Sequence, residues 1–138
     1  FELVVDWQIG SDWRIQPSYS RLYLSSPRLA DPAAAAAQNE LEGRVPRHRA
    51  SLRSSWTLSN GHQFDLWLKY VSLLDNPAVP AYTVLDLRYA VRLGKQAEVA
   101  LIGQNLLDKR HMEFVADSLP SQPSEIGRSL MLKGTWRF

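Results

Sequence analysis

The chain contains 138 residues, of which 45% are hydrophobic and 22% charged, and sixteen Lys and Arg against fourteen Asp and Glu leave a net charge of +2. So small a surplus indicates little about partners, while the lack of cysteine excludes disulfide scaffolds and thiolate metal sites. No stretch approaches the roughly 18 consecutive apolar residues of a transmembrane helix, whereas a membrane-spanning strand needs only about 9–11 residues with every second one apolar.

Seven segments are predicted strands, and all but the sixth, which alternates poorly, alternate polar and apolar residues as a strand does when one face is wet and the other apolar. In chain order they are residues 1–9, 12–24, 46–58, 62–73, 80–93, 97–105 and 126–138. In the third, every odd position from 47 to 57 is polar, and the even positions include Leu52 and Trp56. Pro17 predicts a bulge in the second, because proline has no backbone donor. The pattern predicts an all-β, antiparallel up-and-down meander of about seven transmembrane strands.

The connections between these segments alternate in length. Residues 9–11, 59–61 and 94–96 form tight turns, whereas residues 25–45, 74–79 and 106–125 form longer loops. Outer-membrane barrels have short periplasmic turns and long extracellular loops, so the asymmetry favours such a barrel over a soluble meander. Within the first long loop, Asp31 and Pro32 before five Ala, with Gly43 as the stop, predict a short capped helix.

Aromatic residues gather toward the two ends of the predicted strands. One set lies beside the short turns or at the C-terminus and the other toward the opposite ends: Trp7, Trp13, Trp56, Phe64, Trp136 and Phe138, then Tyr19, Tyr23, Tyr70 and Tyr82. Trp and Tyr favour membrane–water interfaces, and two aromatic belts are typical of a transmembrane barrel. The alternative is the core of a soluble β-sandwich or small barrel that binds a ligand.

Strand direction predicts that the chain is part of a larger protein. If the C-terminus is periplasmic, seven strands place Phe1 on the outer side, whereas a complete bacterial barrel has an even strand number and both ends in the periplasm. Phe1 also begins within a strand-like pattern, and no signal peptide precedes it. We therefore expect one partial barrel domain over residues 1–138, without a plug domain.

The residues that could carry chemistry do not form a catalytic arrangement. The three His show no ligand spacing and no Gly-rich phosphate loop is present, so the sequence predicts neither an enzyme nor a metal site nor a cofactor. Basic and aromatic residues fall on opposite strand faces, which argues against nucleic-acid binding.

Candidate ligand-binding residues fall on the polar strand face and in the last long loop. They are Arg47, Arg49, Arg53, Arg88, His111 and Glu113. The arginines suit an anionic ferric chelate, but the sequence favours their pairing with Asp65, Asp86 and Glu98 across strands. The pair His111 and Glu113 could touch a metal chelate, although a packing role in the loop is the favoured interpretation.

The last 60 residues resemble the C-terminal end of TonB-dependent receptors of Gram-negative outer membranes. The matching stretches are Pro80-Ala-Tyr-Thr-Val-Leu-Asp-Leu-Arg-Tyr89, Gly103-Gln-Asn-Leu-Leu-Asp108, His111-Met-Glu-Phe114 and the final fourteen residues ending in Trp136-Arg-Phe138. The resemblance implies uptake of a ferric siderophore or similar scarce ligand through a 22-stranded, plugged barrel. It also implies contact with outer-membrane lipid and with the TonB complex, the latter through a region N-terminal to this chain.

The terminal strand also resembles the signal read by the barrel assembly machinery. Leu132, Gly134, Trp136 and Phe138 carry this resemblance, although Gly134 is one position off the commonest spacing. Alternatively, Phe138 anchors the strand at the rim. A porin or an autotransporter translocator remains the alternative among outer-membrane barrels.

Overall fold

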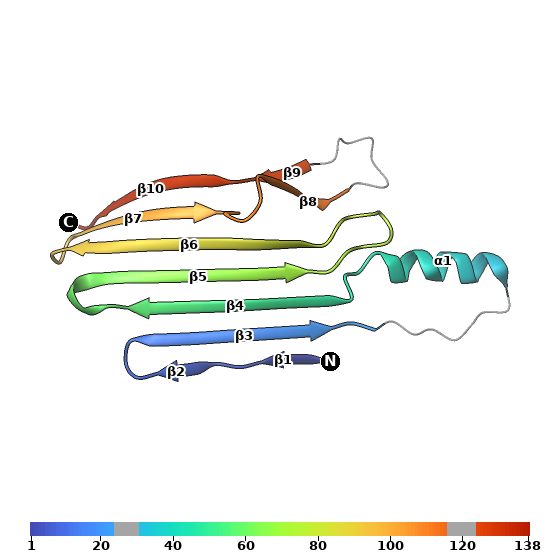
Figure 1. The fold of residues 1–138 in the computed structure, drawn as a ribbon, viewed down its shortest axis with the longest axis horizontal. Helices are drawn as coiled ribbons and strands as arrows, with labels where there is room; N and C mark the ends of the chain where they lie inside the picture. The colour runs from blue at the N-terminus through green and yellow to red at the C-terminus, as the bar shows by residue number, and fades with distance from the viewer. Residues whose placement is uncertain (24–30, 116–123) are drawn as a thin grey trace.

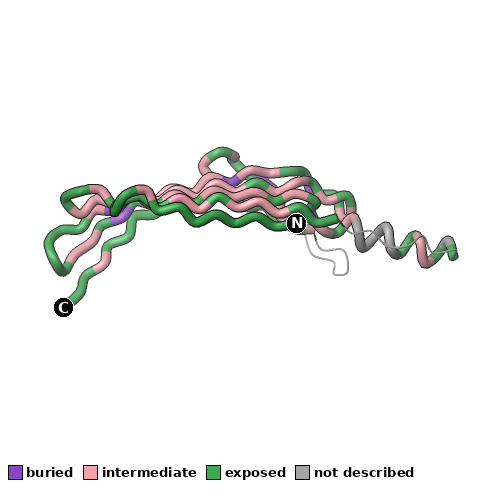
Figure 2. Tube along the Cα trace, turned by 90° about the horizontal axis from the view of Figure 1, so that it is seen from below, coloured by how far each residue is buried: buried purple, intermediate pink, exposed green. Residues whose placement is uncertain are grey.

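A computed structural model describes residues 1–23, 31–115 and 124–138 and consists mainly of one antiparallel sheet lying in a single layer (Figures 1 and 2). Its strands pair in the order β1-β3-β4-β5-β6-β7-β10, with β2 also on β3. The bounds are β1 (Glu2–Val4), β2 (Trp7–Ile9), β3 (Trp13–Arg21), β4 (His48–Thr57), β5 (His62–Val71), β6 (Tyr82–Leu93), β7 (Ala97–Gln104) and β10 (Ser129–Trp136). The predicted all-β meander is confirmed, and the sheet does not close.

The first predicted strand corresponds to β1 and β2 together. Leu3 faces Tyr19 and Trp7 faces Ile15, so both short strands pair with β3 in one register. The interruption lies opposite Pro17, which has no N–H to donate, although its carbonyl accepts from the N–H of Val5 at 3.0 Å. The register between β3 and β4 is also unbroken. The predicted bulge at Pro17 is therefore wrong, because a missing donor interrupts the ladder without an extra residue.

Short turns join the strands at one end of the sheet, which we call the short-turn end (left in Figure 1). Gly10, Gly61 and Gly94 occupy these turns with φ of 61°, 80° and 71°. Residues with a side chain rarely adopt a positive φ, so glycine lets the chain reverse at no steric cost. A 3₁₀ turn, η1 (Ser59–Gly61), contributes Asn60 at φ 68°. The asymmetry of short and long connections that the sequence predicted is present.

The opposite end, here the long-loop end, carries the helix α1 (Pro32–Gly43). The N–H of Ala33 donates to the Asp31 carboxylate at 3.1 Å, which confirms the predicted N-cap. The last helical residue, Gly43, accepts from the N–H groups of Asp75 and Asn76 at 3.2 and 3.1 Å. These bonds join the helix to the neighbouring loop 74–79. Residue 24 of the second predicted strand and residues 25–30 of the first predicted loop lie outside the described residues.

The last predicted loop, 106–125, contains regular structure. Strand β8 (Arg110–Phe114) pairs with β9 (Ser124–Gly127) as a separate two-stranded sheet. The final strand therefore begins at Ser129 and not at residue 126, and the earlier residues belong to the β8–β9 hairpin. Residues 116–123 lie outside the described residues. The amide of Asn105 donates to the Ile126 carbonyl at 2.9 Å and ties the hairpin to the end of β7.

A conventional hydrophobic core is lacking among the described residues. Only Val79, Val84, Ala90 and Ala100 are buried apolar side chains. The last three share the sheet face that also carries the charged residues, where longer side chains cover them. None of the described helices is long and apolar enough to cross a membrane.

Candidate functional site

The strand register places the apolar stripes of all the meander strands on one side of the sheet, which we call the apolar face. Side chains directly opposite in paired strands point to the same side. Two rows of such partners cross the sheet: Pro17, Leu52, Leu68 and Leu85, and Ile15, Ser54, Leu66, Leu87, Gly103 and Leu130. Alternation within one strand cannot show whether the apolar stripes of neighbouring strands lie on the same side of the sheet. The register shows that they do.

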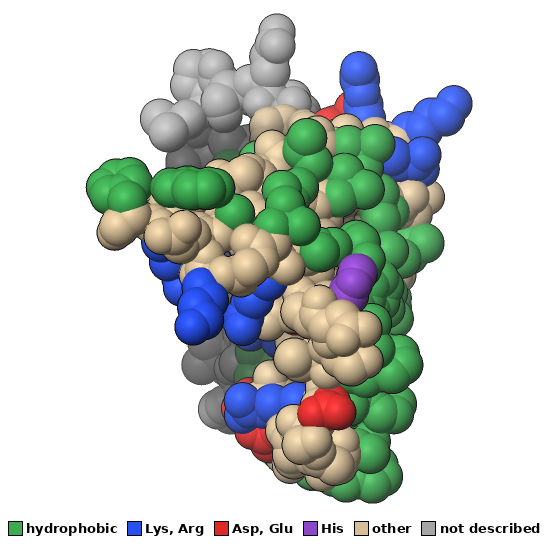
Figure 3. All heavy atoms as spheres, turned by 90° about the vertical axis from the view of Figure 1, so that its left-hand side faces the viewer, with side chains coloured by type: hydrophobic (Ala, Val, Ile, Leu, Met, Phe, Trp, Pro, Cys, Tyr) green, Lys and Arg blue, Asp and Glu red, His purple; other side chains and the backbone are tan. Residues whose placement is uncertain are grey.

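None of the described elements covers the apolar face. Leu101, Leu132 and Trp136 are 51%, 74% and 65% exposed, and no apolar side chain of the described strands is buried on this side. Figure 3 shows hydrophobic side chains along one side of the sheet. Soluble monomers rarely expose a contiguous apolar patch larger than a few hundred Å². A face that spans seven strands therefore indicates a surface that contacts another apolar phase.

Three hydrogen-bonded pairs of side chains lie near the two ends of the apolar face. At the short-turn end the indole N–H of Trp13 donates to Ser54 Oγ at 2.8 Å, and the Trp13 ring lies 6.2 Å from Trp56. His62 Nδ1 lies 2.6 Å from the Tyr89 hydroxyl at the same end. At the long-loop end, the Tyr19 hydroxyl lies 2.7 Å from Nδ1 of His48. The face thus presents no unsatisfied side-chain polar group at these positions.

One aromatic residue lies elsewhere than the sequence predicted. Tyr82 pairs with Val71 and points to the side opposite the apolar face, where its ring stacks on His111 with centroids 4.7 Å apart. It is therefore not a member of the predicted tyrosine belt. Tyr82 and Tyr89 are an odd number of residues apart in β6, so their side chains point to opposite faces of the sheet. The aromatic content of the strand alone does not reveal this.

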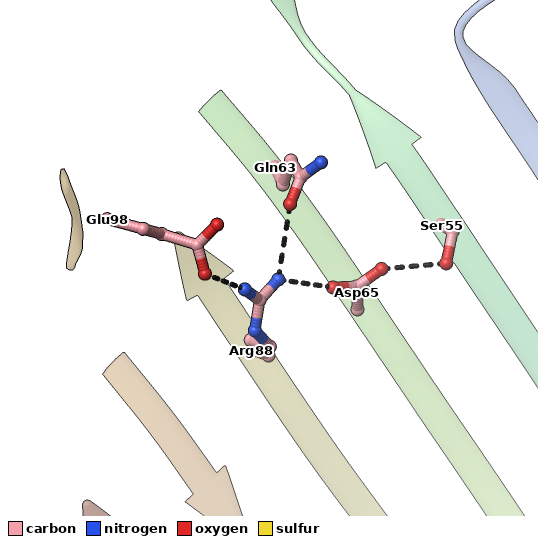
Figure 4. Close-up of polar contacts among 5 residues, drawn as sticks. All are labelled: Ser55, Gln63, Asp65, Arg88 and Glu98. Carbon is pink, nitrogen blue, oxygen red and sulfur yellow. Dashed lines mark hydrogen bonds and ion pairs between the residues drawn. The ribbon is translucent and has the colours of Figure 1, made fainter. Parts of the chain in front are cut away.

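The opposite side of the sheet, here the polar face, carries a charged network centred on Arg88 (Figure 4). Its guanidinium donates to Asp65 at 3.0 Å, to Glu98 at 2.5 Å and to Gln63 at 3.4 Å. Ser55 Oγ donates to the other Asp65 oxygen at 2.7 Å. The network joins four adjacent strands. Arg88 is therefore engaged by carboxylates, which is the pairing that the sequence analysis favoured over a free ligand-binding cation.

The other predicted arginines have different environments. Arg53 stacks over the ring of Trp67 at 4.1 Å from its centroid, and Lys69 lies over the same ring at 4.3 Å. Such a contact holds a cation in place without neutralising it, although Lys69 also pairs with Asp86 at 3.6 Å. Arg49 is exposed on the polar face, and Arg47 is exposed just before β4. The available signal for this stack in the sequence is that Trp67 interrupts the alternation of polar and apolar residues along residues 62–73.

The predicted pair His111 and Glu113 lies together on β8. Nε2 of His111 is 2.8 Å from Glu113, and the histidine side chain is 7% exposed between Tyr82 and the hairpin. This burial favours the packing role over a ligand contact. Among the described residues, no group of three or more His, Cys, Asp or Glu is arranged to hold a metal ion.

The C-terminal residues lie on an edge strand. Leu132, Gly134 and Trp136 pair with Leu101, Val99 and Ala97 and share the apolar face. Phe138 follows the end of β10 and is fully exposed. The side of β10 away from β7 has no partner strand among the described residues.

Comparison of the chain with protein-family models, with curated protein sequences and with solved structures found no match.

Replacing Arg88 with Met tests the network. The substitution leaves Asp65 and Glu98 without their shared cation, and we expect the free energy of unfolding to fall by about 1 kcal/mol, between the values of exposed and buried pairs. Denaturant unfolding of the intact protein measures this change. Arg92→Met is the matched control, since Arg92 lies on the same strand and face and has no carboxylate partner among the described residues. Equal losses in the two variants contradict a specific role for the network.

Proposed function

We propose that this chain forms part of the wall of an outer-membrane β-barrel, with the apolar face toward lipid and the polar face toward the lumen. The observation that carries the proposal is the register, which collects the apolar stripes of seven strands on one uncovered side. Transmembrane barrels have this arrangement, with apolar residues outside, polar residues inside and aromatic residues near both ends of the strands.

The energetics favour lipid over water at the apolar face. Removing one large apolar side chain from water contributes about 1.5–3 kcal/mol. Native domains are stable by only about 5–15 kcal/mol in total. If a sheet with rows of exposed Leu, Val and Trp remains in water, it lacks a free energy of apolar burial comparable to the whole stability of a domain. Lipid supplies that contribution without a second layer of protein.

The open edges favour a larger closed barrel. β1 and β2 at one edge and β10 at the other leave one side of each strand without a partner in the described sheet. Unpaired N–H and C=O groups cost several kcal/mol each in hydrocarbon, so membrane sheets close. We infer that further strands, in a barrel of the 22-stranded kind, complete the wall.

The proposed activity is TonB-dependent uptake of a ferric siderophore or similar scarce ligand, without covalent chemistry. The resemblance of the last 60 residues supports this assignment. The polar face adds cations that remain available, since Arg49 is exposed and Arg53 stacks on Trp67 and pairs with no carboxylate of the described residues. In this mechanism the outer loops and α1 surround the entry, the lumen conducts the ligand and a plug moves under force from the TonB complex.

The test uses the complete protein in its own cell. Heat-modifiable migration of the protein from the outer-membrane fraction supports a membrane barrel, because such barrels stay folded in detergent until heated. Accumulation of radioactive iron by iron-limited cells, lost on gene deletion, supports the uptake function. A detergent-independent soluble protein contradicts the barrel. A barrel whose deletion leaves iron accumulation unchanged contradicts the uptake function and favours another transport role.

Deletion of Phe138 tests the proposed assembly signal. Because Phe138 contacts little of the sheet, its loss costs little folding stability, so we expect a several-fold fall in folded protein in the outer membrane to reflect recognition by the assembly machinery. Quantitative immunoblotting of heat-modifiable protein measures the fall. Phe138→Tyr is the control and is expected to assemble normally. If the deletion variant reaches the wild-type level, Phe138 is no more than a rim anchor.

A further inference from the structure

The polar face has a positively charged recess at the short-turn end. Its lining includes four cations: Arg92 of β6, Lys95 of the turn that follows, Lys133 of β10, and Arg137 just beyond the end of β10. All four are exposed. Lys95 and Arg137 lie beyond the strand ends, so the positive charge extends to the rim of the sheet.

The one carboxylate that lines the recess pairs with a cation outside it. Glu98, its one carboxylate, lies directly opposite Arg92 across the β6–β7 pair. Glu98, however, forms its ion pair with Arg88 at 2.5 Å, farther into the sheet. Among the described residues, no carboxylate pairs with any of the four cations of the recess. The central network therefore occupies the carboxylate that could have neutralised this end.

The spacing of the cations fits an extended chain of negative charges. Lys133 of β10 and Arg137 just beyond its end lie four residues apart, which is about 13 Å in an extended chain. Arg92 lies two strands away from β10, at about 10 Å. Alternate side chains of an extended peptide are about 7 Å apart on one side, so acidic residues at alternate positions can meet successive cations. A single small anion can contact only some of the four cations. To contact all of them, it would have to bring their like charges close together.

We propose that this recess docks an acidic, extended segment of a separate protein that approaches from the short-turn side. The four cations supply the attraction, and the Thr135 hydroxyl and the polar groups of the 94–96 turn supply hydrogen-bonding partners along the recess. Charge complementarity of this kind sets specificity and association rate, and it weakens with salt. The inference depends on the polar face and its charges, whichever ligand the protein transports.

The experiment uses the intact purified protein in detergent and a fluorescent eight-residue peptide with Glu at alternate positions. Fluorescence anisotropy is expected to show saturable binding that weakens steeply as salt increases. The double variant Lys133→Glu with Arg137→Glu is expected to raise Kd by about tenfold or more. The same peptide with Gln in place of Glu is expected not to bind.

A matched double variant controls for net charge. Lys109→Glu with Arg128→Glu makes the same charge change beside the other end of β10, where both residues are exposed, and is expected to leave Kd unchanged. Lys95→Glu, in an exposed turn, replaces the double variant if that one does not fold, and it is also expected to weaken binding. Equal effects at the two ends overturn the proposal. So does displacement of the peptide by an equal concentration of inorganic phosphate, which indicates a small-anion site, and so does absence of binding to the unmodified protein.

Discussion

Leu101→Arg is expected to lower the free energy of unfolding of the lipid-reconstituted protein by about 2–4 kcal/mol, whereas Met131→Arg costs about 0–1 kcal/mol. Leu101 and Met131 are matched because they are 51% and 49% exposed, lie on adjacent strands and occupy strand interiors. They differ in face, since Leu101 shares the apolar face with Leu132 and Met131 shares the polar face with Ile102. An arginine at the first position must enter hydrocarbon, and at the second it meets the aqueous lumen.

Denaturant unfolding in lipid, with both variants and the parent under one set of conditions, measures the difference. Equal small effects of about 0.5 kcal/mol or less are the behaviour of exposed surface positions in water. That result contradicts the assignment of the apolar face to lipid. A larger loss for Met131→Arg reverses the two faces.

Asn105→Ala is expected to cost about 2–3 kcal/mol and to release the β8–β9 hairpin. Asn105 is 1% exposed and lies at φ 52°, a left-handed conformation that Asn tolerates and Ala does not, at about 1–2 kcal/mol. Its amide also donates to the Ile126 carbonyl, and an unmade buried hydrogen bond costs about 1–3 kcal/mol. Proteolysis within the hairpin and denaturant unfolding both measure the change.

Asn105→Gly separates the two contributions. Glycine accepts the positive φ but supplies no amide, so this variant should regain the conformational part of the loss and leave the hairpin loosely held. If Ala and Gly variants lose equal stability, the backbone conformation contributes nothing. If neither variant exposes the hairpin to protease, Asn105 does not anchor it.

Much of this fold could be predicted because strand patterning is local. Apolar residues recur at every second position over whole strands, and glycines occupy turns that need positive φ, so strands and short turns can be located from the sequence. The capped helix at Asp31 was likewise predictable from adjacent residues. The effect of Pro17 was not, since its missing donor matters only through the partner strand that lies opposite.

Other features depend on contacts between distant residues. The break before Ser129 arises because the preceding residues pair with β8, so the single strand expected from continuous alternation becomes two. Tyr82 belongs to the polar face because of its parity in β6 and its contact with His111. Glu98 pairs with Arg88 and not with Arg92, although Arg92 lies directly opposite it. This pairing depends on how far the side chains reach across the strands, which sequence spacing alone does not give.

The most direct test of the central claim uses single cysteines introduced one at a time along β7, a strand within a chain that has no cysteine of its own. The complete protein is reconstituted in lipid, spin-labelled at each position from 98 to 103, and probed with a lipid-soluble and a water-soluble relaxation agent. We expect an alternation of period two, with Val99 and Leu101 accessible from lipid and Glu98 and Ile102 from water. Accessibility to the water-soluble agent on both faces contradicts it.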